Sequence, residues 1–264
     1  MPKVSIFILL AIVIFTFFGS FFYTTSAYEL DPSSILLAPT TSHPFGTDRL
    51  GRDLLARVIE GGKISLIIGV GSAFLASFIG FFLGSLAGYF RGKIDKVFVI
   101  SVDLFLTFPT FFLLLALVSY INASALTLII IISITGWMTT ARLIRSEAFK
   151  ITSQPYIKIL NIAKTNRIKI LFKYYAPILA PIYFVSFIFG VGGAILAESG
   201  LSFLGLGIVA PQMSWGSILS DGKEVIEIAW WVSFFPGLMI FLVTFALINI
   251  SNYLQTLTNK KQVL

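Results

Sequence analysis

The apolar residues of this chain are gathered in long blocks and do not alternate with polar ones. A helix needs about 20 apolar residues to cross the roughly 30 Å of hydrocarbon in a bilayer. Six runs reach or approach that length, at residues 4–23, 64–90, 97–119, 125–141, 177–197 and 230–254. Since lipid is the simplest solvent for such blocks, the pattern predicts an all-α membrane protein with six transmembrane helices.

The first run is followed by Thr25-Ser26-Ala27, which could serve as a small-residue cleavage site. Its apolar core is, however, longer than the 7–15 residues of a typical secretory signal core. We therefore expect a retained anchor helix at the N-terminus.

Composition supports the membrane interpretation, and the distribution of charge predicts an orientation. The chain is 57% hydrophobic and 12% charged, whereas soluble domains carry about 25% charged residues. With the N-terminus inside, 14 of the 19 Lys and Arg residues fall in segments 1–3, 91–96, 142–176 and 255–264, on the cytoplasmic side. Because cytoplasmic loops are enriched in Lys and Arg, we expect both termini in the cytoplasm. The net charge of +7 is explained by this placement, so no nucleic-acid partner is expected.

Few side chains in the predicted spans can carry chemistry. Asp103 and Glu198 are the two carboxylates in or at the ends of these runs, and carriers driven by ion gradients normally place ionisable groups near the membrane midplane. There is no phosphate-binding G-x-x-x-x-G-K-[ST] motif, no cysteine, and one histidine, His43. We expect no catalytic site, no metal site and an energy source outside this chain. A gradient-driven carrier or channel acting without an ATPase is the alternative.

The second run carries small residues at four-residue spacing, namely Ser72, Ala76, Gly80, Gly84 and Gly88. Such a stripe lies on one helix face and lets another backbone approach closely. A tight helix pair inside this protein is the favoured interpretation, and a seam between two subunits is the alternative.

Residues 142–176 form the longest predicted cytoplasmic segment, with eight cations and one acidic residue, Glu147. Apolar positions at helical period predict a short helix–turn–helix there. Three roles are open: a solvated loop, adhesion to anionic lipid, or docking to a cytoplasmic partner. Docking is favoured because a plain connection between antiparallel helices needs only a few residues.

Three motifs resemble those of one transporter family. Residues 43–53 read HPFGTDRLGRD, residues 94–96 read IDK and precede Asp103 and Phe108-Pro109, and residues 198–207 read ESGLSFLGLG and precede Pro211 and Ser214-Trp215-Gly216. When the first and third motifs occur together, they are specific to one family. From residue 43 to about 254 the chain resembles the C-type permeases of the dipeptide/oligopeptide/nickel ABC importers.

The resemblance implies a type I ABC importer transmembrane fold in the inner membrane and a cargo of peptides, nickel or metal chelates. It implies a second homologous permease, two ATPase subunits that bind ATP and Mg²⁺, and an extracytoplasmic solute-binding protein, with no cofactor in this chain. The implied organisation is an anchor and outer segment at 1–62, a permease domain at 63–254 with its coupling loop at 142–176, and a tail at 255–264.

The coupling loop would seat in the ATPase, and its candidate contacts are Gln154, Tyr156, Lys158, Leu160, Lys164, Asn166 and Arg167. The family pattern E-A-A-x3-G is replaced here by Lys158, Ile159, Leu160 and Lys164. Glycine tolerates a positive φ at the turn and lysine does not, so we expect Asn161 or Asn166 to make that turn. The added charge predicts a more acidic groove in the ATPase.

The outer motif contains Asp48, Arg49, Arg52 and Asp53, whose spacing predicts an interfacial helix with i,i+4 pairs of Asp48 with Arg52 and Asp53 with Arg57. Thr47 or Asp48 would cap that helix. These residues, with Trp215, are candidates either for a structural role, which is favoured, or for contact with the binding protein.

Residues 199–216 are rich in glycine, including Gly205, and predict an irregular loop that lines water or is covered by protein. We expect Glu198 to accept hydrogen bonds from backbone amides of this loop, with solute contact as the alternative. Asp103, near Pro109, is expected to be a packing or hinge residue, with substrate contact as the alternative.

Overall fold

The computed structural model describes residues 2–121 and 123–263, and within them it is helical with no β-strand. The helices are α1 (Lys3–Phe22), α2 (Leu54–Phe90), α3 (Gly92–Leu106), α4 (Thr110–Val118), α5 (Ala125–Thr152), α6 (Pro155–Ile162), α7 (Arg167–Ile170), α8 (Ala176–Phe203), α9 (Trp215–Lys223) and α10 (Trp231–Val263). A 3₁₀ turn covers Pro32–Ser34, and a π-helical turn, Leu171–Tyr175, joins α7 to α8. Five helical segments are long and apolar enough to span a membrane, or six with α3 and α4 taken together. The all-α prediction is confirmed.

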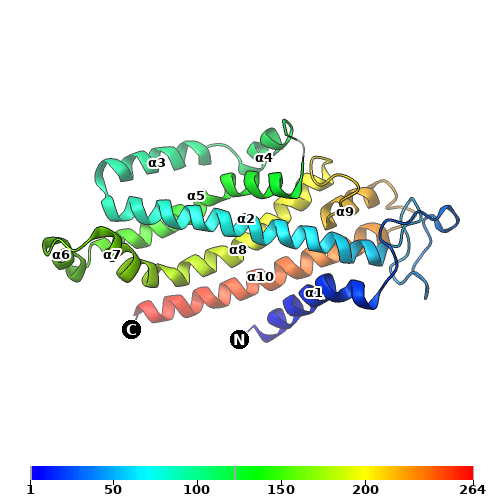
Figure 1. The fold of residues 1–264 in the computed structure, drawn as a ribbon, viewed down its shortest axis with the longest axis horizontal. Helices are drawn as coiled ribbons and strands as arrows, with labels where there is room; N and C mark the ends of the chain where they lie inside the picture. The colour runs from blue at the N-terminus through cyan, green and yellow to red at the C-terminus, as the bar shows by residue number, and fades with distance from the viewer. Residues whose placement is uncertain (1, 122, 264) are drawn as a thin grey trace.

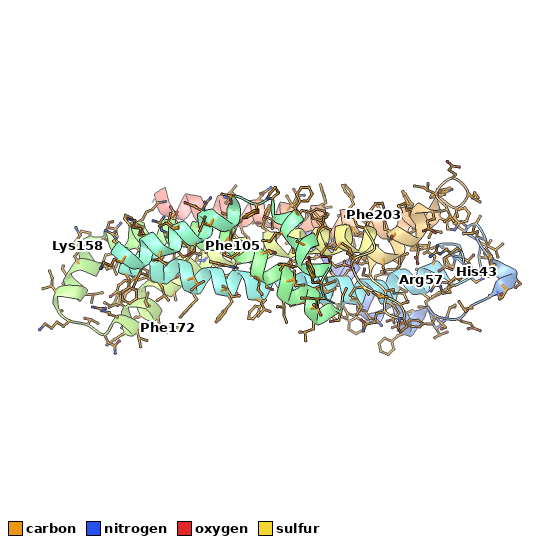
Figure 2. The ribbon with its side chains drawn as sticks, turned by 90° about the horizontal axis from the view of Figure 1, so that it is seen from above. His43, Arg57, Phe105, Lys158, Phe172 and Phe203 are labelled. Atoms are coloured by element: carbon orange, nitrogen blue, oxygen red, sulfur yellow. The ribbon has the colours of Figure 1, made fainter. Side chains whose placement is uncertain are left out.

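The bundle is elongated, with α2, α5, α8 and α10 running along its length (Figure 1). The turn between α6 and α7 lies at one end, and α9 with the segment between α1 and α2 lies at the other. Helix α1 packs against α10 and α2, while α3 and α4 lie on the side of the bundle away from α10. Figure 2 shows the same two ends, marked by Lys158 and His43.

The small-residue stripe of α2 packs against α5 of the same chain. A Cβ atom added at Gly80 would meet the Trp137 carbonyl oxygen at 2.7 Å, and one at Gly84 would meet the Ala141 carbonyl oxygen at 2.5 Å. The helices therefore touch backbone to backbone, which only small residues allow. The interpretation as a tight helix pair within the protein is confirmed.

The third predicted span is not one helix. Helix α3 ends at Leu106, α4 begins at Thr110, and the two axes differ by 78°. Pro109 lacks the N–H that a continuing helix needs, and a proline disfavours helical geometry in the residue before it, here Phe108. The predicted span at 97–119 is therefore made of two helices that bend at this proline, and not of one continuous helix.

The segment 142–176, which was predicted to be cytoplasmic, contains the predicted helix–turn–helix, formed by α6 and α7. Lys164 itself adopts the left-handed conformation at the turn, with φ of 53°. Asn161 lies inside α6, and Asn166 caps α7 by accepting a hydrogen bond from the Ile168 amide at 2.9 Å. The expectation that an asparagine would make the turn was wrong, because the turn follows from where α6 ends.

Replacing Lys164 with glycine should relieve the strain at this turn, since a non-glycine residue pays about 1–2 kcal/mol in the left-handed region. Lys164→Ala is the matched control, because it removes the same charge but keeps a Cβ. We expect Lys164→Gly to be more stable than Lys164→Ala by about 1 kcal/mol in thermal unfolding of the detergent-solubilised chain. Equal stability of the two variants would contradict a strained turn.

Candidate functional site

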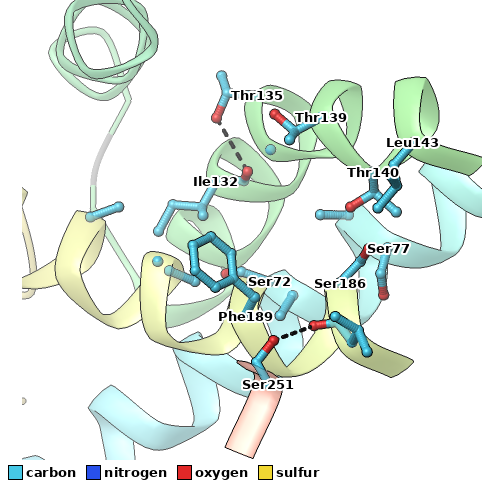
Figure 3. Close-up of a pocket in the computed structure, with 18 of the residues that line it drawn as sticks. Ser72, Ser77, Ile132, Thr135, Thr139, Thr140, Leu143, Ser186, Phe189 and Ser251 are labelled. Atoms are coloured by element: carbon cyan, nitrogen blue, oxygen red, sulfur yellow. Dashed lines mark hydrogen bonds between the residues drawn. The ribbon is translucent and has the colours of Figure 1, made fainter. Parts of the chain in front are cut away.

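A cavity of about 460 Å³ opens among α2, α4, α5, α8 and α10 (Figure 3). Helix α5 presents Thr135, Thr139 and Thr140 to it, and the remaining polar side chains are Ser72, Ser77, Thr110, Ser186, Ser251, Asn252 and Gln255. No described lining residue carries a charge. Apolar groups such as Phe189 complete the wall.

Some of the hydroxyl groups that line the cavity donate hydrogen bonds to carbonyl oxygens of the helix backbone. Thr135 donates to the Ile131 carbonyl oxygen at 3.1 Å, and Ser251 donates to that of Val185 at 3.1 Å. Each oxygen keeps lone pairs that can accept a hydrogen bond from a passing solute. The cavity therefore offers polar but neutral contacts to a solute.

A network of three arginines and three carboxylates closes the end of the bundle that is opposite α6. Asp48 is buried and pairs with both Arg57 and Arg52, the latter at 2.7 Å. Arg57, also buried, reaches Asp221 of α9 at 3.0 Å. Arg49 pairs with Glu224 at the exposed edge. The network thus ties the start of α2 to α9, 164 residues away in the chain.

Asp53 has a different role from the one its spacing predicts. One oxygen accepts the Ala56 amide at 2.8 Å and caps α2, and the other contacts Tyr23 at 2.7 Å and His43 at 2.8 Å. Burial, together with the hydrogen bond to Asp53, raises the pKa of Tyr23 to about 12. Asp53 therefore fastens the end of α1 and the outer loop to the start of α2.

The predicted interfacial helix in the outer motif is absent. Residues 46–53 form turns closed by an isolated β-bridge between Thr47 and Asp53, and the cap of the following helix is Asp53. The Asp48–Arg52 pair forms, as predicted, but Arg57 pairs with Asp48 instead of Asp53. Gly46 and Gly51 both have a positive φ, which lets the chain turn compactly between Thr47 and Asp53. A regular helix cannot contain residues with this backbone conformation.

Most residues proposed to contact the binding protein are buried. Asp48, Asp53 and Trp215 are 0–3% exposed, and the Trp215 indole donates to the Val58 carbonyl oxygen at 2.9 Å. These three residues are therefore structural in this conformation. Arg49 alone among the five proposed residues presents a largely exposed side chain, at 42%.

Glu198 lies inside α8 and is fully buried. It accepts hydrogen bonds from serine hydroxyls, including Ser202 at 2.7 Å and Ser65 at 3.2 Å. Backbone amides of the following loop bind those serines in turn, as Trp215 does with Ser65 at 3.0 Å. The expectation of direct amide contacts was wrong, yet the carboxylate still organises the loop, through the hydroxyls. Gly205, with φ of 81°, makes the turn that ends α8.

Two ion pairs join α3 to α5. Arg145 forms an ion pair with Asp95, in which Nη2 of the arginine lies 2.7 Å from Oδ2 of the aspartate, and Arg142 forms the other pair with Asp103. The second pair is half-exposed, which is consistent with the packing role expected of Asp103. Pro109 lies at the break between α3 and α4.

The candidate coupling residues gather at the α6–α7 end. Lys158, Lys164 and Arg167 are exposed, Tyr156 is 41% exposed, and Leu160 is partly buried. The Gln154 carbonyl oxygen accepts hydrogen bonds from backbone amides in the first turn of α6. Ile157 and Ile170, both fully buried, anchor the two helices to the bundle. The structure therefore presents a basic surface on a firmly held turn.

Sequence reasoning missed the cavity and Asp221. The hydroxyls of α5 recur at 135, 139 and 140, and such spacing within an apolar run could have indicated a polar helix face. No local signal could have paired Asp221 with Arg57, because the two residues are far apart in the chain.

Comparison with solved structures identifies the fold of this helical bundle. The fold matches a chain of the MetNI methionine ABC transporter in an inward-facing conformation, with a TM-score of 0.59, 16% identity, and coverage of 75% of this chain and 96% of that one. The fold is thus that of an ABC transporter transmembrane subunit.

Residues 80–262 match the family of binding-protein-dependent transport system inner membrane components, and the chain belongs to that family. It is 32% identical to the oligopeptide transport system permease protein OppC of Haemophilus influenzae, over 91% of this chain and 78% of that protein. It is also 32% identical to the dipeptide transport system permease protein DppC of Bacillus subtilis, over 97% and 81%. The resemblance to permeases and the inner-membrane location are confirmed.

Proposed function

We propose that this chain is the permease subunit of an ATP-driven peptide importer and forms half of its translocation pathway. A second homologous permease supplies the other half, two ABC ATPases bind ATP and Mg²⁺ on the cytoplasmic side, and a solute-binding protein delivers the peptide from outside. The names of the relatives OppC and DppC support peptides over nickel or a metal chelate as cargo.

The neutral cavity is the observation that carries this proposal. Its hydroxyl and amide groups can hydrogen-bond to peptide groups. Coupling to an ion gradient normally uses a titratable group in the pathway, and the described lining offers none. The work of transport then comes from partner subunits.

The α6–α7 turn supports docking of the ATPase on the side where both termini are proposed to lie. Five cations, Lys158, Lys164, Arg167, Lys169 and Lys173, occur there, with no acidic residue between Glu147 and Glu198. Ile159 and Ile162 are 64% and 81% exposed beside them. A basic surface with an apolar centre suits an acidic groove with an apolar floor.

Reconstitution in vesicles tests the function. The chain, its companion permease, the ATPases and the binding protein should take up a labelled peptide only with ATP, and an ionophore should have no effect. Uptake by this chain alone, or uptake abolished by the ionophore, would favour the gradient-driven carrier or channel instead.

Lys158→Glu should weaken binding of the ATPase, because a like charge placed against an acidic groove opposes docking. We expect about a tenfold loss of co-purified ATPase, equivalent to about 1.4 kcal/mol. Lys93→Glu is the matched control, since Lys93 is also exposed and is predicted to lie on the same side, but on α3. Equal loss in the two variants would show that overall charge, and not the α6–α7 turn, governs binding.

A further inference from the structure

The cavity among α2, α4, α5, α8 and α10 has one aromatic side chain in its described lining, that of Phe189 on α8. The other apolar lining residues are aliphatic or small, and they include Gly136, Gly190 and Gly193. Phe189 is 59% exposed. A bulky apolar ring therefore projects into a cavity that is otherwise lined by hydroxyls, amides and smaller apolar groups.

Phe189 is not packed as a core aromatic side chain is. A core aromatic ring stabilises a fold by burying about 150–250 Å² of surface. Phe189 belongs to none of the three hydrophobic clusters found among the described residues. The ring–ring contacts of the described part of α8 involve Tyr183, Phe184 and Phe187 instead. Packing within this chain therefore does not account for the ring.

The position of Phe189 places the ring where it narrows the cavity. Phe189 lies near the middle of α8, thirteen residues after its start and fourteen before its end. Figure 3 shows the ring pointing from α8 toward Ile132 of α5. Gly193 lies one turn further along the same face of α8, and a Cβ atom added there would meet no atom within 4 Å. The space beside the ring is therefore open.

The polar part of the wall does not distinguish one peptide side chain from another. The hydroxyls of Thr135, Thr139 and Ser186 can hydrogen-bond to backbone amide groups, which every peptide carries. No described lining residue is charged, so this wall does not select side chains by charge. A projecting ring acts on size instead, because a bulky side chain and the ring cannot occupy the same space.

We propose that Phe189 limits the size of the peptide side chains that can pass this chain's half of the pathway, and is thus a specificity-determining residue. The inference rests on the proposed function, in which the cavity belongs to the pathway of an ATP-driven peptide importer. It adds that the permease itself selects peptides by size, after the binding protein has released them.

Uptake of two peptides by vesicles that hold the assembled complex tests the role of Phe189. Radiolabelled Ala-Ala-Ala and Ala-Trp-Ala are supplied separately with ATP, each at a saturating concentration, so that the affinity of the binding protein does not enter the comparison. Phe189→Ala should raise the ratio of the Ala-Trp-Ala rate to the Ala-Ala-Ala rate about tenfold, the lower end of the discrimination that a pocket shows for one methylene group. The concentration that gives half-maximal uptake should not change.

Gly193→Leu tests the same space in the opposite direction. It adds a side chain where the structure leaves room, so it should lower the ratio, and the combination of Phe189→Ala with Gly193→Leu should bring the ratio back toward that of the parent. Phe184→Ala is the matched control, because Phe184 is 55% exposed on the same helix and is not among the lining residues. Its ratio should equal that of the parent.

An unchanged ratio in Phe189→Ala, or an equal rise in Phe184→Ala, would overturn the size-limiting role, while ATP-dependent uptake of Ala-Ala-Ala would leave the proposed function standing. Loss of the companion permease from the purified Phe189→Ala complex would show that the ring packs against that subunit, and would also overturn the role. If the parent complex takes up neither peptide with ATP, the proposed function fails, and the role of Phe189 fails with it.

Discussion

Replacing Asp48 with asparagine should lower the free energy of unfolding by about 3–5 kcal/mol, the usual cost of removing one partner from a buried ion pair. Asparagine keeps the oxygen that accepts the Leu50 and Arg52 amides, so the change removes charge and leaves the turn able to form. Arg57, whose side chain is 4% exposed, would then rely on Asp221, which is 25% exposed. The loss should appear in equilibrium unfolding of the purified chain in detergent.

Glu224→Gln is the control for Asp48→Asn. This variant also breaks an ion pair between an arginine and a carboxylate, here Arg49 and Glu224, but both side chains are largely exposed. The free energy of unfolding should therefore fall by less than about 1 kcal/mol. Combining Asp48→Asn with Arg57→Met should recover part of the loss, because no uncompensated buried charge remains. A single variant at Asp48 that is no less stable than Glu224→Gln would show that the network does not hold α2 to α9.

Gly84→Leu should destabilise the bundle by about 3 kcal/mol or more, at or beyond the upper end of the usual cost of overpacking. Its Cβ alone would lie 2.5 Å from the Ala141 carbonyl oxygen and 3.1 Å from the Arg145 amide nitrogen. Both obstacles are backbone atoms, so no change of side-chain rotamer can relieve the clash, and α2 must move away from α5. Yield of monodisperse protein and the midpoint of thermal unfolding measure the effect.

Gly193→Ala provides the comparison. A Cβ at Gly193 would find no atom within 4 Å, and alanine favours the helix by up to about 1 kcal/mol over glycine. This variant should be as stable as the parent chain or slightly more stable, while Gly84→Ala falls between it and Gly84→Leu. If Gly84→Leu were as stable as Gly193→Ala, the close contact of α2 with α5 would be wrong.

Much of the architecture could be predicted because it depends on local pattern. Apolar runs must find lipid or protein, so five of the six predicted spans each fall on one long helix, although α2 begins ten residues before its predicted span and α5 ends eleven residues after its own. The stripe at Gly80 and Gly84 predicted close packing because glycine has no side chain to hold two helix backbones apart. The basic helix–turn–helix followed from helical period within a polar segment.

The candidate site was predicted less well because its contacts join distant segments. Spacing alone paired Asp53 with Arg57, on the assumption that residues 46–53 are helical, whereas the folded turn presents Asp48 to Arg57. Lys164 was judged unable to take a positive φ, yet it does so because the fold places the end of α6 at that residue. The neutral cavity draws one face from each of five helices, so no single segment reveals it.

The amino-acid pattern alone determined that this protein spans a membrane with helices, that its charges collect at the ends, and that it carries no nucleotide-binding motif. Those properties follow from the free energy of transferring each segment between water and lipid, which depends on composition and period. The tertiary structure decided where α3 breaks, which carboxylate neutralises Arg57, and which hydroxyls share one cavity. Those outcomes depend on the packing of segments distant in the chain, and that packing is set by shape and charge across the whole bundle.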